Sequence, residues 1–432
     1  MDPNVAHGVS RRVFLGAAAG LAAIVHRPLF AQPAAPSDQI QLALIGVGGM
    51  GTGRLKEFMT HPDVRIAAIC DVDGRHRDAA IALVQSTLGY APPGEGDFRR
   101  LLTNKDIDAV AIQTPDHWHA ITAVRAMGAG KDVFVEKPLS YSVAEGRAMA
   151  DASTRHARVT QMGNHIHNTG RNYREVVELV QSGRLGRIQR VTCWRTWGSM
   201  LTNNEPATKP AELDYDFWLG PAPKREYQPL RSHLTFRNFW DYSGGTFIDF
   251  WCHIMDVAVW ALDLKAPRSV SAMGGRFVVN DATETPDNLE AMLEYPNLLV
   301  SFSLRPEPPP GFIHMGGIGC IFEGSEGTLV TNYGKHEVWV KGKLAPDFAP
   351  PAPSIPDSPG HLREFLDGIK SRNIETTCNV RYGHRLTKLG LLSNIAYRTG
   401  RRLTWDDARE RFVGDGDADK YLSRKFRKPY NL

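Results

Sequence analysis

Short apolar runs alternate with amphipathic stretches between Gln39 and Asn164. The apolar runs have the length of buried strands and fall at Ile40–Ile45, Val64–Cys70, Ala109–Gln113, Val133–Glu136 and Arg158–Gly163. The stretches between them place apolar residues at helical spacing, at Gly74–Leu88, Trp118–Met127 and Val143–His156. Strands that alternate with helices predict an α/β domain with a doubly wound parallel sheet over residues 39–164. Ligands of such sheets bind beyond the carboxyl ends of the strands.

After Asn164 the pattern becomes rich in strands. Helices are predicted at Gly170–Ser182, Thr246–Leu262, His361–Ser371 and Gly383–Thr399. Strands are predicted near Ile188–Thr196, Ser269–Val278, Leu289–Glu294, Leu298–Leu304, Cys320–Glu323 and Val338–Val340. Residues 200–238 look irregular, and the proline-rich residues 345–359 are typical of a surface crossing. We therefore expect residues 165–432 to form a second, α+β domain, whose open and mostly antiparallel sheet has helices on one side.

The N-terminus fits neither pattern. Ser10-Arg11-Arg12-Val13-Phe14-Leu15 precedes a small apolar run that ends at Val25. This resembles a twin-arginine export signal, and the run is shorter than the roughly 20 residues that span a membrane. We expect residues 1–31 to be a signal peptide, residues 32–38 a linker, and the mature protein to be periplasmic or extracellular after passage through the twin-arginine machinery. The alternative is a cytoplasmic protein in which the arginine pair arises by chance.

Charge and cysteine usage exclude several classes of protein. The formal net charge is +4 with no long basic block, so we predict no nucleic-acid partner. The five cysteines are scattered and lack C-x-x-C spacing, which indicates neither a disulfide framework nor a zinc site. Two histidine pairs, His117/His119 and His165/His167, have a spacing that could hold a metal on a strand. No cysteine or carboxylate cluster completes a set of ligands, so we predict no metal.

The exit of the first strand carries a glycine pattern. Gly46, Gly48 and Gly51 fit G-x-G-x-x-G between a strand and a helix. In a dinucleotide fold the first glycine allows the turn, the second lets backbone approach a diphosphate, and the third lets helix and strand pack closely. Gly49 and Met50 lie in the same loop and are predicted to contact the cofactor. The diphosphate would then lie at the positive end of the helix.

An acid follows the second strand, about 20 residues beyond the glycines. Asp71 is placed to accept the ribose hydroxyls of a dinucleotide, which favours NAD(H) because a carboxylate repels a 2′-phosphate. Arg75 and Arg77 lie close by in the sequence and could reverse that preference. The sequence therefore predicts NAD(H) and leaves NADP(H) open.

Further polar residues fall where they can meet this crevice. Thr114-Pro115 and Glu136-Lys137-Pro138 follow two other strands. Asp249 and His253 are four residues apart on a predicted helix and so share one face. A histidine can accept a hydroxyl proton, a carboxylate can orient substrate, and a lysine can stabilise an alkoxide-like oxygen.

The glycine fingerprint, the Glu136-Lys137-Pro138 triplet and the stretch 244–256 together resemble the Gfo/Idh/MocA family, relatives of glucose–fructose oxidoreductase and inositol dehydrogenase. The resemblance implies a Rossmann domain and NAD(P)-dependent chemistry on the CH–OH groups of sugars or cyclitols. It assigns Lys137, Asp249 and His253 to catalysis. It places Thr114, Pro115, His119, Glu136 and Lys137 near the cofactor. The C-terminal part resembles the exported branch of the family.

The chain departs from the family pattern at Trp251, where many relatives have glycine, so the size of the sugar stays open. Asp256 ends the pattern, and we interpret it as structural. Several tryptophans interleave with Arg195, Arg231 and Arg237. These side chains suit sugar faces, hydroxyls or a uronate, but they equally suit an aromatic core, and we assign no site to them.

These observations predict an exported oxidoreductase that transfers hydride between a carbohydrate and a tightly bound nicotinamide. Free nicotinamide cofactor is scarce outside the cytosol, so we expect the cofactor to be regenerated on the enzyme. Two redox-neutral routes fit the same residues. One couples the oxidation of one sugar to the reduction of another. The other oxidises a glycoside transiently, eliminates the aglycone and reduces the sugar again, which gives net hydrolysis or epimerisation. A noncatalytic sugar-binding protein is the alternative from another class. The open sheet face predicts a homo-oligomer.

Overall fold

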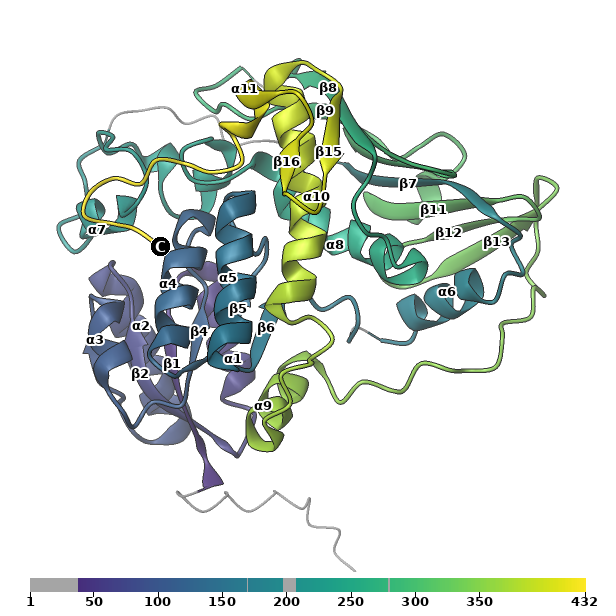
Figure 1. The fold of residues 1–432 in the computed structure, drawn as a ribbon. Coiled ribbons are helices and arrows are strands. Elements are labelled where there is room, and N and C mark those ends of the chain that lie inside the picture. The colour runs from purple at the N-terminus through teal and green to yellow at the C-terminus, as the bar shows by residue number, and fades with distance from the viewer. Residues whose placement is uncertain (1–37, 169, 197–206, 279) are drawn as a thin grey trace, which may run out of the picture.

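The computed structural model describes residues 38–168, 170–196, 207–278 and 280–432. The predicted signal peptide and all but the last residue of the predicted linker lie outside the described residues. The described chain forms two sheets, one parallel and one mixed (Figure 1). This confirms the predicted fold class.

The first sheet has six parallel strands in the order β3-β2-β1-β4-β5-β6. The strands are β1 (Ile40–Ile45), β2 (Val64–Cys70), β3 (Gly94–Glu95), β4 (Ala109–Ile112), β5 (Asp132–Glu136) and β6 (Thr160–Gly163). The helices that connect them are α1 (Gly49–Phe58), α2 (Gly74–Leu88), α3 (Phe98–Thr103), α4 (Asp116–Gly128) and α5 (Val143–His156). β4 is buried throughout, and β1 is buried at every residue but Gln41, because helices cover both faces of the sheet. All the carboxyl strand ends therefore open at one edge.

The second sheet has ten strands in the order β14-β13-β12-β11-β7-β10-β9-β8-β15-β16. Their bounds are β7 (Ile188–Thr196), β8 (Ser269–Gly275), β9 (Asn288–Tyr295), β10 (Leu298–Arg305), β11 (Ile318–Gly324), β12 (Thr328–Thr331), β13 (His336–Val340), β14 (Lys343–Leu344), β15 (Leu403–Asp406) and β16 (Arg411–Phe412). The pair β7–β10 is parallel and the other paired strands are antiparallel.

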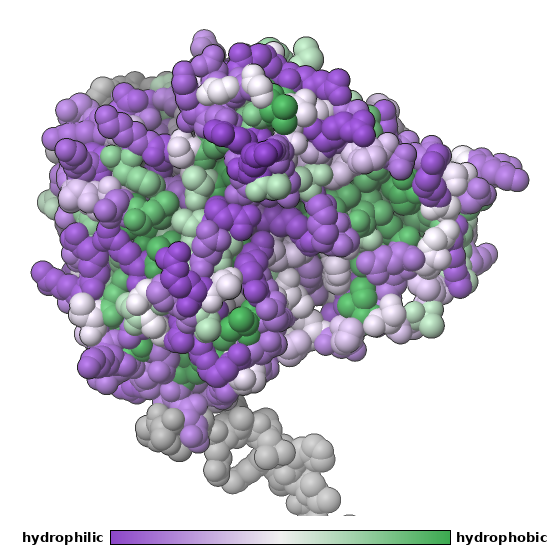
Figure 2. Space-filling model, in the orientation of Figure 1, coloured by the Kyte–Doolittle hydropathy of each residue, from purple (hydrophilic) through white to green (hydrophobic). Residues whose placement is uncertain are grey.

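Helices α6 (Asn172–Gln181), α8 (Gly245–Leu262) and α10 (Val380–Thr399) cover one face of this sheet. Short elements fill the rest: α7 (Tyr215–Leu219), α11 (Gly416–Asp419) and the 3-10 turns η2 (Pro229–Arg231), η3 (His233–Asn238) and η4 (Ile313–Met315). Figure 2 shows a largely hydrophilic surface that hydrophobic side chains interrupt over the second sheet.

α8 is the one helix among the described residues that is long and apolar enough to cross a membrane. Most of it is buried between the sheet and α10, as in the core helix of a globular domain. Trp251 on α8 points into this core. Its Nε1 donates to the carbonyl of Leu386 at 2.9 Å, and its ring lies where a Cβ at Gly390 would stand. The large side chain at the family's glycine position therefore faces α10.

Helix α9 (His361–Ser371) returns to the first sheet after the proline-rich crossing, which runs along the edge of the molecule in Figure 1. Phe365 and Leu366 are buried in one cluster with Leu42 and Phe134, strand residues of the first sheet. A boundary after residue 164 therefore does not separate the two cores, because a segment from the C-terminal part completes the first one.

Candidate functional site

The glycine loop begins where β1 ends. Gly46 has a φ of +84°, and a Cβ there would lie 2.8 Å from the backbone of Gln113. A Cβ at Gly51 would lie 2.0 Å from the carbonyl oxygen of Gly46. The surrounding backbone therefore leaves no room for a side chain at either position, and both residues have to be glycine. Beside Gly49, in contrast, no described heavy atom outside the helix backbone and the neighbouring residues lies within 4 Å of a Cβ position, so the start of α1 is open to a ligand.

Gly48 caps α1 without a side-chain hydrogen bond, and Met50 is 49% exposed. The first turn of α1 therefore presents backbone N–H groups to an open surface. This is the arrangement that binds a diphosphate at a helix N-terminus.

Asp71 lies at the end of β2 beside this loop. Its Oδ2 accepts from the backbone N–H of Val47 at 2.8 Å, and its Oδ1 accepts from that of Asp73 at 2.8 Å. Burial raises the pKa of Asp71, and the two backbone bonds oppose that shift. The carboxylate thus stands next to the glycine loop, in the position predicted for a ribose acceptor.

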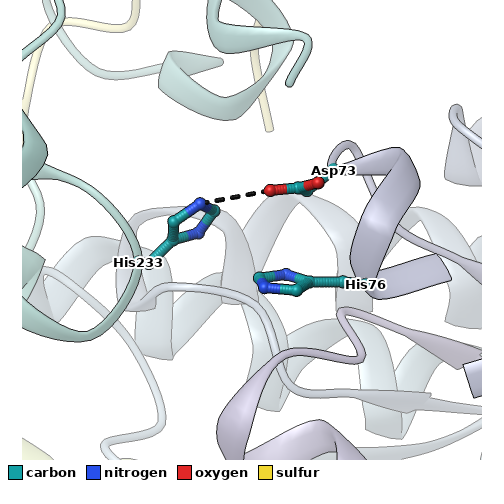
Figure 3. Close-up of side chains that lie close together, drawn as sticks. All are labelled: Asp73, His76 and His233. Carbon is teal, nitrogen blue, oxygen red and sulfur yellow. Dashed lines mark ion pairs between the residues drawn. The ribbon is translucent and has the colours of Figure 1, made fainter. Parts of the chain in front are cut away.

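Two histidines from different parts of the chain flank Asp73 (Figure 3). His76 comes from α2, and His233 from η3 in the second domain; their ring centroids are 4.9 Å apart. His233 Nε2 lies 3.3 Å from Asp73 Oδ2, and His76 Nδ1 lies 3.9 Å from Asp71 Oδ2. A Cβ on Gly48 would stand 3.4 Å from His76 Nδ1. The pair therefore borders the cofactor loop.

The ligand atoms of Asp73, His76 and His233 lie within 4.8 Å of one another, close enough for a metal ion. No sequence pattern connects these residues, because His233 follows 157 positions after His76 in an irregular segment. Asp73 is already bound, however. Arg75 donates from Nε to Oδ1 at 3.1 Å and from Nη2 to Oδ2 at 2.7 Å. A metal would have to displace that guanidinium.

The exit of β4 supplies polar groups on the other side of the loop. Both side-chain polar atoms of Gln113 and the hydroxyl of Thr114 are buried without a hydrogen-bond partner among the described residues. Pro115, the N-cap residue of α4, is half-buried beside them. Unpaired buried groups next to Gly46 fit a site that a polar cofactor completes.

His119 lies beneath this exit and is buried. One ring nitrogen is 2.9 Å from the carbonyl oxygen of Pro138 and the other is 2.9 Å from that of Thr114. The ring therefore bridges the backbone that follows β4 and the backbone that follows β5. Its predicted contact with the cofactor remains a prediction.

Glu136, the last residue of β5, is buried and accepts from Arg54 Nε on α1 at 2.5 Å. A Cβ on Gly163 would lie 2.6 Å from the Glu136 carboxyl carbon, so β6 packs closely over this side chain. The pair links the glycine-loop helix to the strand that carries Lys137.

Lys137 crosses from the first domain to the second. Its Nζ lies 2.6 Å from Asp249 Oδ1 and 3.1 Å from the Asp249 carbonyl oxygen on α8. Arg237 Nε donates to the same Oδ1 at 3.1 Å. Burial alone would raise the pKa of Asp249, but the charges of Lys137 and Arg237 outweigh it and hold that pKa well below its usual range. One carboxylate therefore holds two cations.

His253 lies one turn after Asp249 on α8. Burial and the charge of Lys137 lower the pKa of His253 to about 3. The ring is neutral at physiological pH and keeps a lone pair for a proton. Lys137, Asp249 and His253 thus come together at the carboxyl edge of the first sheet, as the sequence pattern predicts.

A second polar group lies behind this cluster. Asp256 accepts from Asn164 Nδ2 at 2.7 Å and from the hydroxyl of Tyr382, and it lies 3.1 Å from His167 Nε2. Asp256 is buried and joins the end of β6, α8 and α10. This geometry agrees with a structural role.

The sequence predicts no site role for Arg237, Arg195 or Tyr333. The charge of Arg195 nevertheless acts on His253, and the ring centroid of Tyr333 lies 6.3 Å from that of His253. Arg237 lies in an irregular segment, where no periodicity indicates its direction. Arg195 and Tyr333 lie near strand ends that come together only in the folded sheet. These residues could be assigned to the site only from their position relative to α8, and no spacing in the sequence predicts that position.

Two family models match the chain. The model of the NAD-binding Rossmann fold of the Gfo/Idh/MocA oxidoreductase family matches residues 40–164. The model of the C-terminal alpha/beta domain of the same family matches residues 169–283 and 320–432. A glycosyl hydrolase family 109 protein of Shewanella pealeana is 36% identical over 156 residues, which are 35% of this chain and 34% of that protein. One of Shewanella baltica is 30% identical over 206 residues, 42% of this chain and 45% of that protein. The match thus spans less than half of these relatives.

Solved structures share the fold. The WlbA dehydrogenase of Bordetella pertussis, in complex with NADH and UDP-GlcNAcA, is 20% identical with a TM-score of 0.62 over 85% of this chain and 99% of that one. The aldose-aldose oxidoreductase of Caulobacter crescentus is 18% identical with a TM-score of 0.61 over the same shares. The two family models together cover both domains, and the chain therefore belongs to the Gfo/Idh/MocA oxidoreductase family.

Proposed function

We propose that this protein is an NAD(H)-dependent enzyme that acts on a CH–OH group of a sugar, cyclitol or glycoside. The observation that carries the proposal is the 2.6 Å contact between Lys137 Nζ and Asp249 Oδ1, with His253 one turn further along α8. This contact brings the exit of β5, beside the cofactor loop, to the helix of the second domain. A bound nicotinamide supplies the hydride acceptor.

Each of the three residues has a separate task. His253 is neutral and accepts the proton of the reacting hydroxyl. The Lys137 ammonium stabilises the negative charge that develops on that oxygen. Asp249 fixes the position of Lys137 and is itself kept ionised by Lys137 and Arg237. Because Asp249 is held by two cations, its carboxylate acts as an orienting group.

The arginines near Asp71 support NAD(H) over NADP(H). Arg75 is bound to Asp73, and Arg77 Nε donates to Asp78 at 2.9 Å. Neither guanidinium pairs with Asp71, whose carboxylate disfavours a 2′-phosphate.

The predicted twin-arginine signal leads to a further part of the proposal. An exported enzyme meets little free nicotinamide, so we propose that the cofactor leaves the cytosol bound and stays bound. The two histidines beside the start of α1 support retention, since His233 belongs to the second domain and contacts Asp73 and His76 in the first.

The glycosyl hydrolase family 109 relatives favour one redox-neutral variant as a second candidate. In it the sugar is oxidised transiently, loses its aglycone by elimination, takes up water and is reduced again. Hydrolysis is then the net reaction, and the cofactor ends in its starting form.

Mass spectrometry of the denatured purified protein tests the cofactor assignment, and we expect about one NAD per chain. A glycoside panel scored for reduced cofactor and for free aglycone then separates net oxidation from hydrolysis. Lys137→Ala and His253→Ala should each lower turnover at least about 100-fold while the nucleotide stays bound. Folded protein that binds no NAD(P), or variants that keep full turnover, would contradict the proposal. Sugar binding without turnover or isotope exchange would instead indicate a noncatalytic sugar-binding protein.

We also propose that the chain forms a homo-oligomer through the second sheet. Met273, Phe277 and Ile313 line one groove there and are 79%, 73% and 65% exposed. Such apolar side chains are typical of an interface. Sedimentation equilibrium should give at least a dimer, and Phe277→Glu should yield monomers.

A further inference from the structure

The charges around His253 do not balance. Lys137 and Arg237 both bind Asp249. The Asp116 carboxylate, close to Arg237, accepts a hydrogen bond from Ser243 Oγ at 2.5 Å. Arg195 brings a further positive charge to the same group: it influences the pKa values of His253 and Tyr333.

Arg195 has no ion pair among the described residues. Its guanidinium lies over the ring of Phe250 at 4.1 Å, and the ring of Phe250 is 5.4 Å from that of His253. Nη1 reaches the carbonyl oxygen of Gly317 at 3.4 Å, a long hydrogen bond. Nε is buried and has no partner within the described part of the chain.

Burial of a guanidinium without an ion pair is unfavourable, and burial here lowers the pKa of Arg195 although the charge of Asp249 opposes the shift. Oxidised nicotinamide would add another positive charge to the same site. The cation–π contact with Phe250 restricts where the guanidinium can lie. A planar, oriented and unpaired guanidinium is suited to bidentate binding of a carboxylate.

We infer that the substrate is an acidic carbohydrate, a uronic acid or uronide, whose carboxylate binds Arg195 while a ring hydroxyl faces His253. This inference rests on the proposed function. A role in binding the cofactor diphosphate fits less well, because Arg195 belongs to β7 of the second domain, whereas the diphosphate site is the start of α1 in the first.

Matched substrate pairs test the inference. The purified holoenzyme is assayed with p-nitrophenyl β-glucuronide against β-glucoside, and with the galacturonide against the galactoside. Free aglycone and reduced cofactor are both recorded. We expect kcat/KM to be at least about 10-fold higher for each uronide, as a charge-assisted bidentate contact implies.

The variants Arg195→Met and Arg195→Lys then test whether Arg195 is the cause of the preference for uronides. Methionine should remove it, with a loss of about 10- to 100-fold in kcat/KM for the uronide, mainly through KM, and little change for the neutral glycoside. Lysine should restore part of the preference, since the lysine side chain keeps the positive charge but cannot make the bidentate contact. Arg190→Met is the matched control, because Arg190 lies on the opposite face of β7 and is exposed.

Equal use of acidic and neutral sugars, or a preference for sugar phosphates or sulfates over uronides, would overturn the inference and leave the proposed function intact. An Arg195→Met variant that loses both substrate classes equally would also overturn it. If no glycoside or free sugar of either class reduces the cofactor or loses its aglycone, the proposed function itself fails.

Discussion

The Asp249 carboxylate shows how one side chain sets the state of several others. It accepts from Lys137 and Arg237, and in the described structure it is the nearest counter-charge to both. Burial and Lys137 keep His253 uncharged. The histidine is consequently ready to accept a proton but is a weak base, so proton removal has to be assisted by stabilisation of the oxygen left behind. Lys137 provides that assistance.

His233 gives a prediction for cofactor retention. It contacts Asp73 from the second domain, and its φ of +50° is tolerated by asparagine, so His233→Asn removes the ring with little backbone strain. We expect bound NAD to dissociate about 10-fold faster, because the ring packs against His76 and Asp73 beside the cofactor loop. Release into excess competing nucleotide, followed by fluorescence of the reduced form, measures the rate. His314→Asn, in the exposed η4, is the control.

A metal at Asp73, His76 and His233 would give a different result. The purified protein would then contain a stoichiometric metal by elemental analysis, and chelation would change its retention of NAD. Retention that is insensitive to chelation and sensitive to His233→Asn supports the cofactor role.

At the level of elements, the contact between β1 and α1 depends on Gly51. Its Cβ would lie 2.0 Å from the Gly46 carbonyl oxygen, so Gly51→Ala must push the helix off the strand. We expect nearly complete loss of bound nucleotide and a lower thermal midpoint. Gly53→Ala, two residues along the same helix, puts its Cβ where no described heavy atom outside the helix backbone lies within 4 Å, and this variant should keep the nucleotide. Equal occupancy in both variants would contradict the assigned role of the loop.

The same scale shows what sequence patterns can predict. The strands of the first sheet follow from apolar runs and glycine turns, because each is encoded by neighbouring residues. The direction of Trp251 does not follow from its own helix. It depends on Gly390, which lies on α10 and leaves the space the indole occupies. The short strands β12, β15 and β16 also went unpredicted. β15 depends on pairing with the distant strand β8, whereas β12 and β16 are short partners of their neighbours β11 and β15.

At the scale of the whole molecule, the C-terminal tail helps to join the two domains. Arg424 pairs with Glu145 on α5 at 2.6 Å and donates to the carbonyl of His117 at 2.6 Å. His117 in turn lies 3.0 Å, through Nε2, from the carbonyl oxygen of Trp218 in the second domain. A buried histidine thus lies within the joint.

This buried histidine makes stability depend on pH. Burial and the charge of Arg424 lower the pKa of His117 to about 3, from about 6.5 in an unfolded chain. Between these values the unfolded state binds a proton that the folded state does not, so the free energy of unfolding falls as pH falls. From pH 7.5 to 5.5 this amounts to about 1.4 kcal/mol for one such histidine. His165 and His253 shift in the same direction.

Urea unfolding at the two pH values measures the effect, and His117→Gln should reduce the pH dependence by about 1 kcal/mol. The variant keeps Trp218 satisfied, because Trp118 Nε1 donates to the same carbonyl at 3.0 Å. The paired carboxylates do not interfere: the lowered pKa values of Asp249, Asp63 and Glu410 act only below about pH 4.5. If the free energy of unfolding of His117→Gln depended on pH as strongly as that of the wild type, His117 would take up its proton in the folded state. The joint would then open to solvent above pH 5.5.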